Sequence, residues 1–193
     1  MPQRLVLLCE PLPAPHLEQF VRDRAPDLDV RLANNRVQLQ QAMEDAPPQI
    51  RLLAFCASTI VPKSVLRRLD LTPYNIHPGP PAYPGVHPDA FAHADGTATY
   101  GATAHELTAR IDGGAIIAFA ECDVPLGAAR TDYADLGFAC GLDLFRVIVQ
   151  HCLASDGDFP RHPSAEWCGP YNTLQAYHAR FGHDPAANLL TTS

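Results

Sequence analysis

The stretch IRLLAFCA, residues 50–57, is hydrophobic at almost every position. Strands with one solvated face alternate apolar and polar residues, whereas a nearly continuous apolar run is typical of a strand covered on both faces. Strands covered in this way belong to parallel sheets that lie between layers of helices. Residues 50–57 therefore predict a buried strand of an α/β sheet.

The residues before this strand support the same architecture. Residues 4–9 (RLVLLC) form a second apolar run, and residues 29–33 (DVRLA) alternate as a strand. Apolar residues recur at helical spacing over 16–25 and 36–46. Strands that alternate with ten-residue helices require right-handed crossovers. The predicted fold class is α/β, with a doubly wound, mostly parallel twisted sheet and helices on both faces.

The remaining chain adds further elements and a different C-terminal end. Helices are expected over 61–70, 87–96 and 131–154, with Thr131 as N-cap of the last, and strands over 73–78, 99–108 and the apolar part of 109–124. We expect residues 1–155 to form one α/β domain. Residues 156–193 are rich in proline and glycine, and we expect a loop and one short helix packed on the same domain.

Composition limits the classes of partner. Hydrophobic residues make up 47% of the 193, enough for a packed core, and the formal net charge is −7. An acidic surface argues against binding to nucleic acid or to an anionic membrane. We expect no stretch that approaches a membrane span, and the apolar run at the N-terminus is too short for a signal peptide. The expected location is the cytoplasm, where the six cysteines would be reduced core thiols.

Histidine and glycine patterns bear on cofactors. Four of the nine histidines, His77, His87, His93 and His105, could in principle form a zinc site. No H-x-x-x-H or H-E-x-x-H motif occurs, however, and separate imidazoles are favoured. We therefore expect no metal. No glycine follows the first strand in CEPLPAPHLE (9–18), so a phosphate-binding loop for a nucleotide is not expected.

Polar residues follow the predicted strand at 73–78. Asn75 and His77 are two positions apart, so their side chains would point to one face, and the proline-rich run PGPP (78–81) would end the strand just after them. About thirty residues later come the segments GATAH (101–105) and DGGAI (112–116). Asp112 alone could be an ordinary Asp-Gly turn that bonds its own backbone.

Taken together, these motifs resemble the catalytic domain of the folate-dependent formyltransferases, which include glycinamide ribonucleotide transformylase, methionyl-tRNA formyltransferase and sugar N-formyltransferases. The segment AFCASTIVPKSVL (54–66) is similar as well. The run HPGPP (77–81) resembles instead the formyltransferase-like domain of a hydrogenase-maturation protein that makes carbon monoxide from a formyl-folate. The resemblance covers residues 50–150 well and the first fifty residues only by architecture.

The resemblance implies 10-formyltetrahydrofolate as co-substrate and a catalytic set of Asn75, His77 and Asp112. Asn75 and His77 would both donate to the oxyanion of a tetrahedral intermediate, and Asp112 would take the proton of the attacking amine. We expect Gly113 and Gly114 to supply the positive φ of the Asp112 turn. His105 is expected to support its strand.

The folate ring is expected between segments 54–62 and 107–116, because ligands of open α/β sheets bind at the carboxyl ends of strands. The predicted cofactor-binding residues are Phe55, Ile60, Val61, Leu107, Ile111 and Gly113. The stiff proline-rich lip, residues 77–88, would form one wall of the amine site with Tyr83 and His87, and residues 10–16 would form the other.

The function expected from the resemblance is therefore N-formyl transfer from 10-formyltetrahydrofolate to a small amine that needs no phosphate. Alternatives are hydrolysis of the formyl-folate, release of carbon monoxide from it, and a folate-binding module without turnover. A homodimer is left open.

Overall fold

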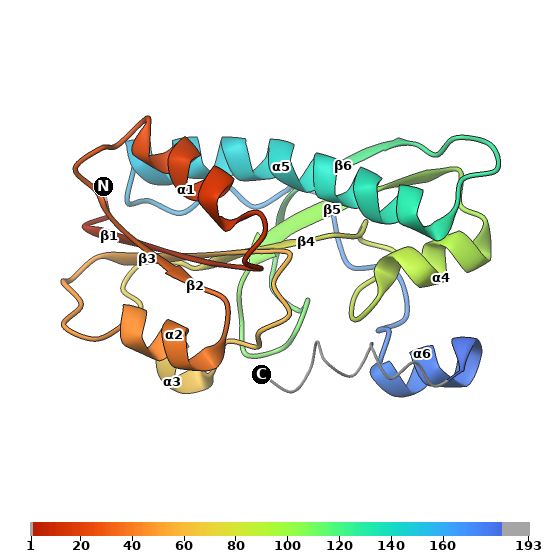
Figure 1. The fold of residues 1–193 in the computed structure, drawn as a ribbon, viewed down its shortest axis with the longest axis horizontal. Coiled ribbons are helices and arrows are strands. Elements are labelled where there is room, and N and C mark those ends of the chain that lie inside the picture. Colours follow the sequence, from red (N-terminus) through yellow and green to blue (C-terminus); the bar gives the residue numbers. More distant parts are fainter. Residues whose placement is uncertain (1, 183–193) are drawn as a thin grey trace.

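The fold is built on one six-stranded sheet with the order β2-β1-β3-β4-β5-β6 (Figure 1). The computed structural model describes residues 2–182, so the last eleven residues of the predicted C-terminal segment lie outside the described part. Strands β2, β1, β3 and β4 pair in parallel, whereas β5 and β6 are antiparallel. The strands are β1 (Arg4–Cys9), β2 (Asp29–Ala33), β3 (Ile50–Phe55), β4 (Tyr74–His77), β5 (Thr99–Glu106) and β6 (Ile116–Asp123). The predicted α/β class with a mostly parallel sheet is confirmed.

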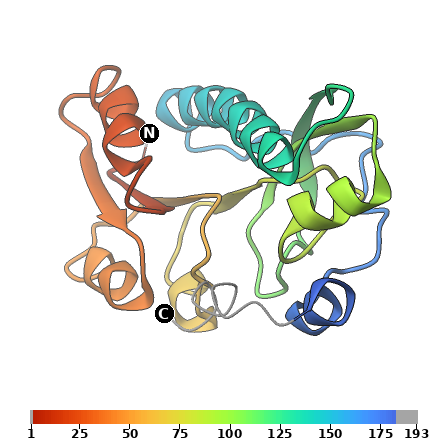
Figure 2. The ribbon, with the colours of Figure 1, turned by 45° about the vertical axis from the view of Figure 1, so that its right-hand side comes forward.

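Helices cover both faces of this sheet. Helices α1 and α5 lie on one face, and α2 and α3 lie on the other (Figures 1 and 2). Two buried clusters follow this division, since Leu17 and Phe145 belong to one and Leu39 and Val65 to the other. The helices are α1 (Ala14–Arg22), α2 (Arg36–Ala42), α3 (Lys63–Leu66), α4 (Pro88–Asp95), α5 (Arg130–Ala154) and α6 (Leu174–Phe181).

The long helix α5 lies close against the sheet. A Cβ atom at Gly137 would lie 3.0 Å from the carbonyl oxygen of Pro78, so any larger residue would push the helix and the sheet slightly apart. The helix begins at Arg130 rather than after a Thr131 cap, because the Asp132 carboxylate accepts the Ala129 amide at 2.7 Å.

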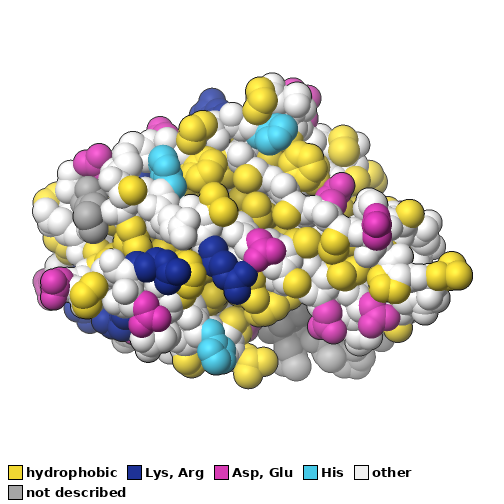
Figure 3. All heavy atoms as spheres, turned by 90° about the horizontal axis from the view of Figure 1, so that it is seen from above, with side chains coloured by type: hydrophobic (Ala, Val, Ile, Leu, Met, Phe, Trp, Pro, Cys, Tyr) yellow, Lys and Arg dark blue, Asp and Glu magenta, His cyan; other side chains and the backbone are white. Residues whose placement is uncertain are grey.

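Contrary to expectation, α5 has the length and composition that a membrane span requires, and it is the one such helix within residues 2–182. Half of its most apolar window is buried inside the protein. Apolar and charged side chains are mixed on the face that carries α1 and α5 (Figure 3). A half-buried apolar stretch next to a mixed polar and apolar surface is typical of a core helix in an α/β protein.

A buried arginine ties the C-terminal segment to the sheet. The side chain of Arg51 on β3 is fully buried and donates to the carbonyl oxygen of Thr72 at 2.7 Å. Its second terminal nitrogen donates to the carbonyls of Asp156 at 3.0 Å and Gly157 at 3.2 Å. A buried charge is tolerated only when it is hydrogen-bonded, and here the partners are the first residues after α5. Arg51 therefore fixes the point from which the chain returns toward the carboxyl ends of the strands.

We expect Arg51→Met to lower the free energy of unfolding by about 2–4 kcal/mol, because three carbonyls lose the charged donor that a buried side chain supplies. Urea unfolding would measure the loss. Arg24→Met is the matched control, because exposed Arg24 also donates to a carbonyl, that of Phe20 at 3.0 Å. The control should change stability by less than about 0.5 kcal/mol. Equal effects of the two substitutions would contradict the anchoring role.

Candidate active site

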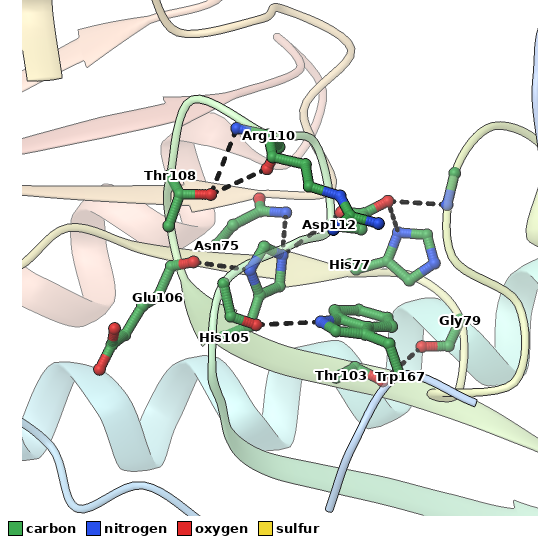
Figure 4. A network of polar contacts seen from close by, with 12 residues as sticks. Asn75, His77, Gly79, Thr103, His105, Glu106, Thr108, Arg110, Asp112 and Trp167 are labelled. Atoms are coloured by element: carbon green, nitrogen blue, oxygen red, sulfur yellow. Dashed lines mark hydrogen bonds and ion pairs between the residues drawn. The ribbon is translucent and has the colours of Figure 1, made fainter. Parts of the chain in front are cut away.

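Polar side chains meet where β4 and β5 lie side by side (Figure 4). The antiparallel register places Asn75 directly opposite His105. Residues that face each other across a strand pair share one side of the sheet. The Asn75 Nδ2 atom is accordingly 3.0 Å from His105 Nε2. His77, two residues after Asn75, ends β4 and is 4% exposed.

The loop between β5 and β6 brings a carboxylate to both imidazoles. Asp112 Oδ2 lies 3.4 Å from His77 Nδ1, and Asp112 Oδ1 lies 3.3 Å from His105 Nε2. The Gly85 amide also donates to Asp112 Oδ2 at 2.8 Å. Asp112 is only 7% exposed. Three segments that are distant in sequence thus converge on one carboxyl group.

Backbone hydrogen bonds close the two ends of this loop, near residues 106–107 and 114–115, which together form its neck. The Glu106 amide donates to the Ala115 carbonyl at 2.9 Å, and the Leu107 amide donates to the Pro73 carbonyl at 2.8 Å. A side chain at Gly114 would lie 1.7 Å from the Glu106 carbonyl oxygen, so the neck requires glycine there. The expected positive φ falls on Asp112 itself, at 44°, and not on Gly113 or Gly114. Aspartate tolerates this conformation better than most residues, and the bonds to its carboxylate hold it there.

Backbone carbonyls fix one proton on each imidazole. His77 Nε2 lies 2.9 Å from the Tyr83 carbonyl oxygen, and His105 Nδ1 lies 2.8 Å from the Glu106 carbonyl oxygen. A carbonyl can only accept, so each of these ring nitrogens carries the hydrogen. In the neutral rings, His77 Nδ1 and His105 Nε2 are therefore unprotonated, and Asn75 donates one of its two amide hydrogens to His105.

Burial lowers the pKa of His77, although the nearby carboxylate of Asp112 opposes the shift. Burial raises the pKa of Asp112. The contacts with His77, His105 and the Gly85 amide outweigh this effect and leave the pKa of Asp112 below its usual value. At neutral pH the pair is thus a neutral imidazole beside an ionised carboxylate. These two groups face each other as two proton acceptors.

The network lies at the edge of a cleft with a volume of about 420 Å³. The predicted segments 54–62 and 107–116 both contribute to this cleft. Ile60 and Ile111 line this cleft and expose 61% and 42% of their surfaces. The cleft lining includes Glu10, Ala54, Cys56, Ile60, Val61, Asn75, His77, Gly85, His87, Leu107, Ile111 and Asp112. Such a slot suits a flat heterocycle.

Within residues 2–182, no group of three or more histidine, cysteine, aspartate or glutamate side chains is arranged to hold a metal ion. His77 and His105 instead share Asp112 and the backbone carbonyls described above. His87 and His93 lie beside aromatic rings, Tyr177 and Tyr133 respectively.

Comparison with known proteins gives the family. A family model described as formyl transferase matches residues 20–135, more than half of the chain. The chain belongs to the formyl transferase family. No curated protein matches the chain.

Solved structures of formyl transferases share its fold. A sugar N-formyltransferase from Shewanella sp. is 16% identical with a TM-score of 0.71, and the match covers 97% of this chain and 85% of that one. The formyltransferase PseJ from Anoxybacillus kamchatkensis, in complex with UDP-4,6-dideoxy-4-formamido-L-AltNAc and tetrahydrofolate, is 15% identical with a TM-score of 0.70, covering 92% and 89%. HypX from Aquifex aeolicus is 20% identical with a TM-score of 0.62, covering 91% of this chain and 31% of HypX. The resemblance inferred from the motifs is confirmed.

Most, but not all, of the residues predicted for folate binding reach the cleft of this formyl transferase. Ile60, Val61, Leu107 and Ile111 line it. Phe55 does not, because its ring packs in the core against Phe145 at 5.7 Å and Phe138 at 5.3 Å. Gly113 does not line this cleft but lines a second cavity, next to Trp167 and Tyr171.

Of the two residues predicted for the amine site, only His87 reaches the cleft. His87 lines the cleft, and its ring lies 4.2 Å from that of Tyr177. The Tyr83 hydroxyl instead donates to Asp95 at 2.9 Å, and only the Tyr83 backbone carbonyl takes part in the site. Of residues 10–16, Glu10 alone lines the cleft, where its carboxylate accepts the Ser58 hydroxyl at 2.7 Å.

The sequence reasoning missed two contributors to the network. His105 contacts both Asn75 and Asp112, whereas we expected it only to support its strand. The alternation of β5 combined with its pairing to β4 could have indicated this position. Trp167 lies beside both imidazoles and comes from the C-terminal segment, where no pattern indicated a site residue.

Proposed function

We propose that this protein transfers the formyl group of 10-formyltetrahydrofolate to the amine of a small acceptor. The observation that carries the proposal is the convergence of Asn75, His77 and Asp112 at one edge of an apolar slot. The family supports a folate donor, and PseJ was crystallised with tetrahydrofolate. In this proposal the folate ring occupies the slot between Ile60 and Ile111, with its formyl group toward Asn75.

The proposed reaction begins with attack of the neutral amine on the formyl carbon. A bond forms between that carbon and the amine nitrogen, and the carbonyl oxygen becomes an oxyanion. The free amide hydrogen of Asn75 stabilises this oxyanion, since the other hydrogen is held by His105. His105 thereby fixes the orientation of the Asn75 amide.

The proton that the attacking nitrogen loses goes to the pair formed by His77 Nδ1 and Asp112. Once protonated, His77 carries a positive charge beside the tetrahedral intermediate, and Asp112 stabilises that charge. The bond between the formyl carbon and N10 of the folate then breaks, and N10 receives the proton. The products are the formamide and tetrahydrofolate, so the site returns to its starting protonation state.

In this scheme His77 accepts the amine proton, whereas the sequence predicted that it donates to the oxyanion. Its Nε2 hydrogen is occupied by the Tyr83 carbonyl. Only a protonated Nδ1 could therefore donate to the substrate, and that proton arrives with the reaction. Asn75 is the donor in the resting site.

In this proposal the acceptor is a small amine, and it places no phosphate at the Glu10 end of the cleft. The Glu10 carboxylate would repel a phosphate there, whereas hydroxyl groups could donate to it. An amino sugar satisfies this requirement, and PseJ was crystallised with a formamido sugar nucleotide. In this proposal a nucleotide, if present, projects away from Glu10.

The test is turnover of 10-formyltetrahydrofolate, followed by the appearance of tetrahydrofolate, with and without a panel of amines. The panel includes free amino sugars, amino-sugar nucleotides and amino acids. Amine-dependent turnover with a stoichiometric formamide supports the proposal. Turnover that is independent of every amine would instead indicate hydrolysis or release of carbon monoxide. Folate binding without turnover would indicate a binding module.

A further inference from the structure

Trp167 is the single tryptophan of the chain and lies beside both imidazoles of the site. Its ring centroid is 5.7 Å from that of His77 and 5.2 Å from that of His105, with interplanar angles of 77° and 79°. The indole N–H donates to the Gly114 carbonyl at 3.0 Å, two residues after Asp112 (Figure 4). One side chain thus contacts both histidines and the loop that carries the carboxylate.

The backbone around Trp167 is fastened to the proline-rich lip. The Cys168 amide donates to the Pro81 carbonyl at 3.1 Å, and the Asn172 amide donates to the Pro84 carbonyl at 2.8 Å. The Val86 amide donates in return to the Asn172 carbonyl at 2.9 Å. These bonds fix the position of the backbone from which the indole projects.

A second cavity of about 300 Å³ lies against the same indole. It is lined by Pro84, Arg110, Asp112, Gly113, Trp167, Gly169 and Tyr171. Arg110 and Tyr171 are exposed, so solvent reaches this cavity. Removal of the indole would extend the cavity toward His77 and His105, and water would then reach their rings.

We propose that Trp167 is a positioning residue, whose indole holds the rings of His77 and His105 at a fixed tilt and excludes water from one side of them. The edge-to-face geometry is the arrangement that aromatic rings prefer, and it resists rotation of the imidazoles. The importance of this role for catalysis rests on the proposed function, in which His77 must accept a proton.

Several polar and charged groups face the two imidazoles. His77 faces the Asp112 carboxylate, the Tyr83 carbonyl and His105. His105 faces Asp112, the Asn75 amide and the Glu106 carbonyl. In the adjoining cavity the charged and titratable side chains are Arg110, Asp112 and Tyr171.

The direction of the expected pH effect follows from burial. Burial lowers the pKa of His77, because an imidazolium is less well solvated inside the protein. Loss of the indole admits water and moves the pKa of His77 back toward its ordinary value. The neutral ring is the form that accepts the proton, so activity should then be lost at a higher pH than in the natural protein.

The first test is spectroscopic and needs no turnover. An imidazolium in contact with an indole quenches its fluorescence, and Trp167 is the only tryptophan that emits. The emission should fall as the pH is lowered from about 8 to 4, as His77 gains a proton. His77→Asn should remove most of this change, and His16→Asn, which replaces an exposed imidazole on α1, should remove none of it. An emission that does not change with pH would overturn the proposal. So would a curve for His77→Asn that is identical to that of the natural protein.

The second test compares Trp167→Leu with Trp167→Phe. We expect the leucine variant to lower kcat about tenfold, with KM for the folate nearly unchanged, and to raise the acid limb of the pH profile by about one pH unit. Phenylalanine keeps an aromatic ring but loses the bond to Gly114, so it should restore part of both effects. Phe119→Leu, which alters another ring next to a histidine, is the matched control. Equal losses in both variants with an unshifted pH profile would overturn the proposal.

The two tests also separate this inference from the proposed function. If the natural protein shows no transfer to any amine, the proposed function fails, whereas the fluorescence titration still decides whether Trp167 reports on the imidazoles. If transfer occurs and the emission does not titrate, the positioning role fails alone.

Discussion

Asp112→Asn should lower kcat by about three orders of magnitude, within the range for loss of a positioned general base. The amide has nearly the same shape, so the fold should persist, but it cannot take a proton or stabilise the His77 imidazolium across 3.4 Å. The KM for the folate should change little, because the apolar walls of the cleft remain. Steady-state kinetics with the best amine of the panel would measure both constants.

The pH profile gives an independent check of Asp112. In the natural protein the acid limb should lie below pH 6.5, the ordinary value for histidine, because burial lowers the pKa of His77. The Asp112 carboxylate opposes that shift, so its removal should move the residual acid limb to still lower pH. Asp143→Asn is the control, since Asp143 is an exposed carboxylate paired with Arg146 on α5. A residual profile that moves upward would contradict the pairing.

The combination of Asp112→Asn with His77→Ala should cost little more than either change alone. The two groups share one incoming proton, and residues that act as a unit are strongly non-additive. Additive losses would mean that His77 and Asp112 act in different steps.

Asn75→Ala should lower kcat by about two to three orders of magnitude, the usual cost of one oxyanion donor. Asn75 is the only group in the resting network that we assign as donor to the formyl oxygen. Asn75→Asp should cost at least as much, since a carboxylate offers no hydrogen and repels the oxyanion. Gln150→Ala, which removes an exposed amide from α5, serves as control. Near-normal turnover in Asn75→Ala would show that another group carries the oxyanion.

The fold could be predicted because local signals and the tertiary structure agree. Residues 50–55 of that run are buried on both faces, and β3 indeed lies in the interior of the sheet. The antiparallel direction of β5 and β6 was not predicted, since their sequences carry no signal for pairing direction. Their connection through a short loop, residues 107–115, could have suggested it, because parallel strands need long crossovers.

The site could be predicted only in part. Asn75 and His77 were correctly placed on β4, and Asp112 joins them in the structure. Phe55 was assigned to the cleft although it is the register partner of Ile76, and both side chains pack into the core cluster with Phe145. Strand alternation therefore argues against Phe55 once Asn75 is assigned to the cleft.

Trp167 could not be predicted for a different reason. It follows an irregular segment with no periodicity, and its position depends on backbone bonds to residues more than eighty positions earlier. Such long-range contacts leave no trace in local sequence patterns.

The closed neck of the loop at 107–115 has a consequence for protein engineering. Both ends are tied to the sheet framework by backbone bonds, through Ala115 and Pro73, while Thr108, Ala109 and Arg110 face solvent. Insertions or replacements at these three positions therefore leave the framework anchors intact. The loop can be exchanged as a cassette to accommodate donors with altered ring systems, provided that Asp112 and Gly114 are kept.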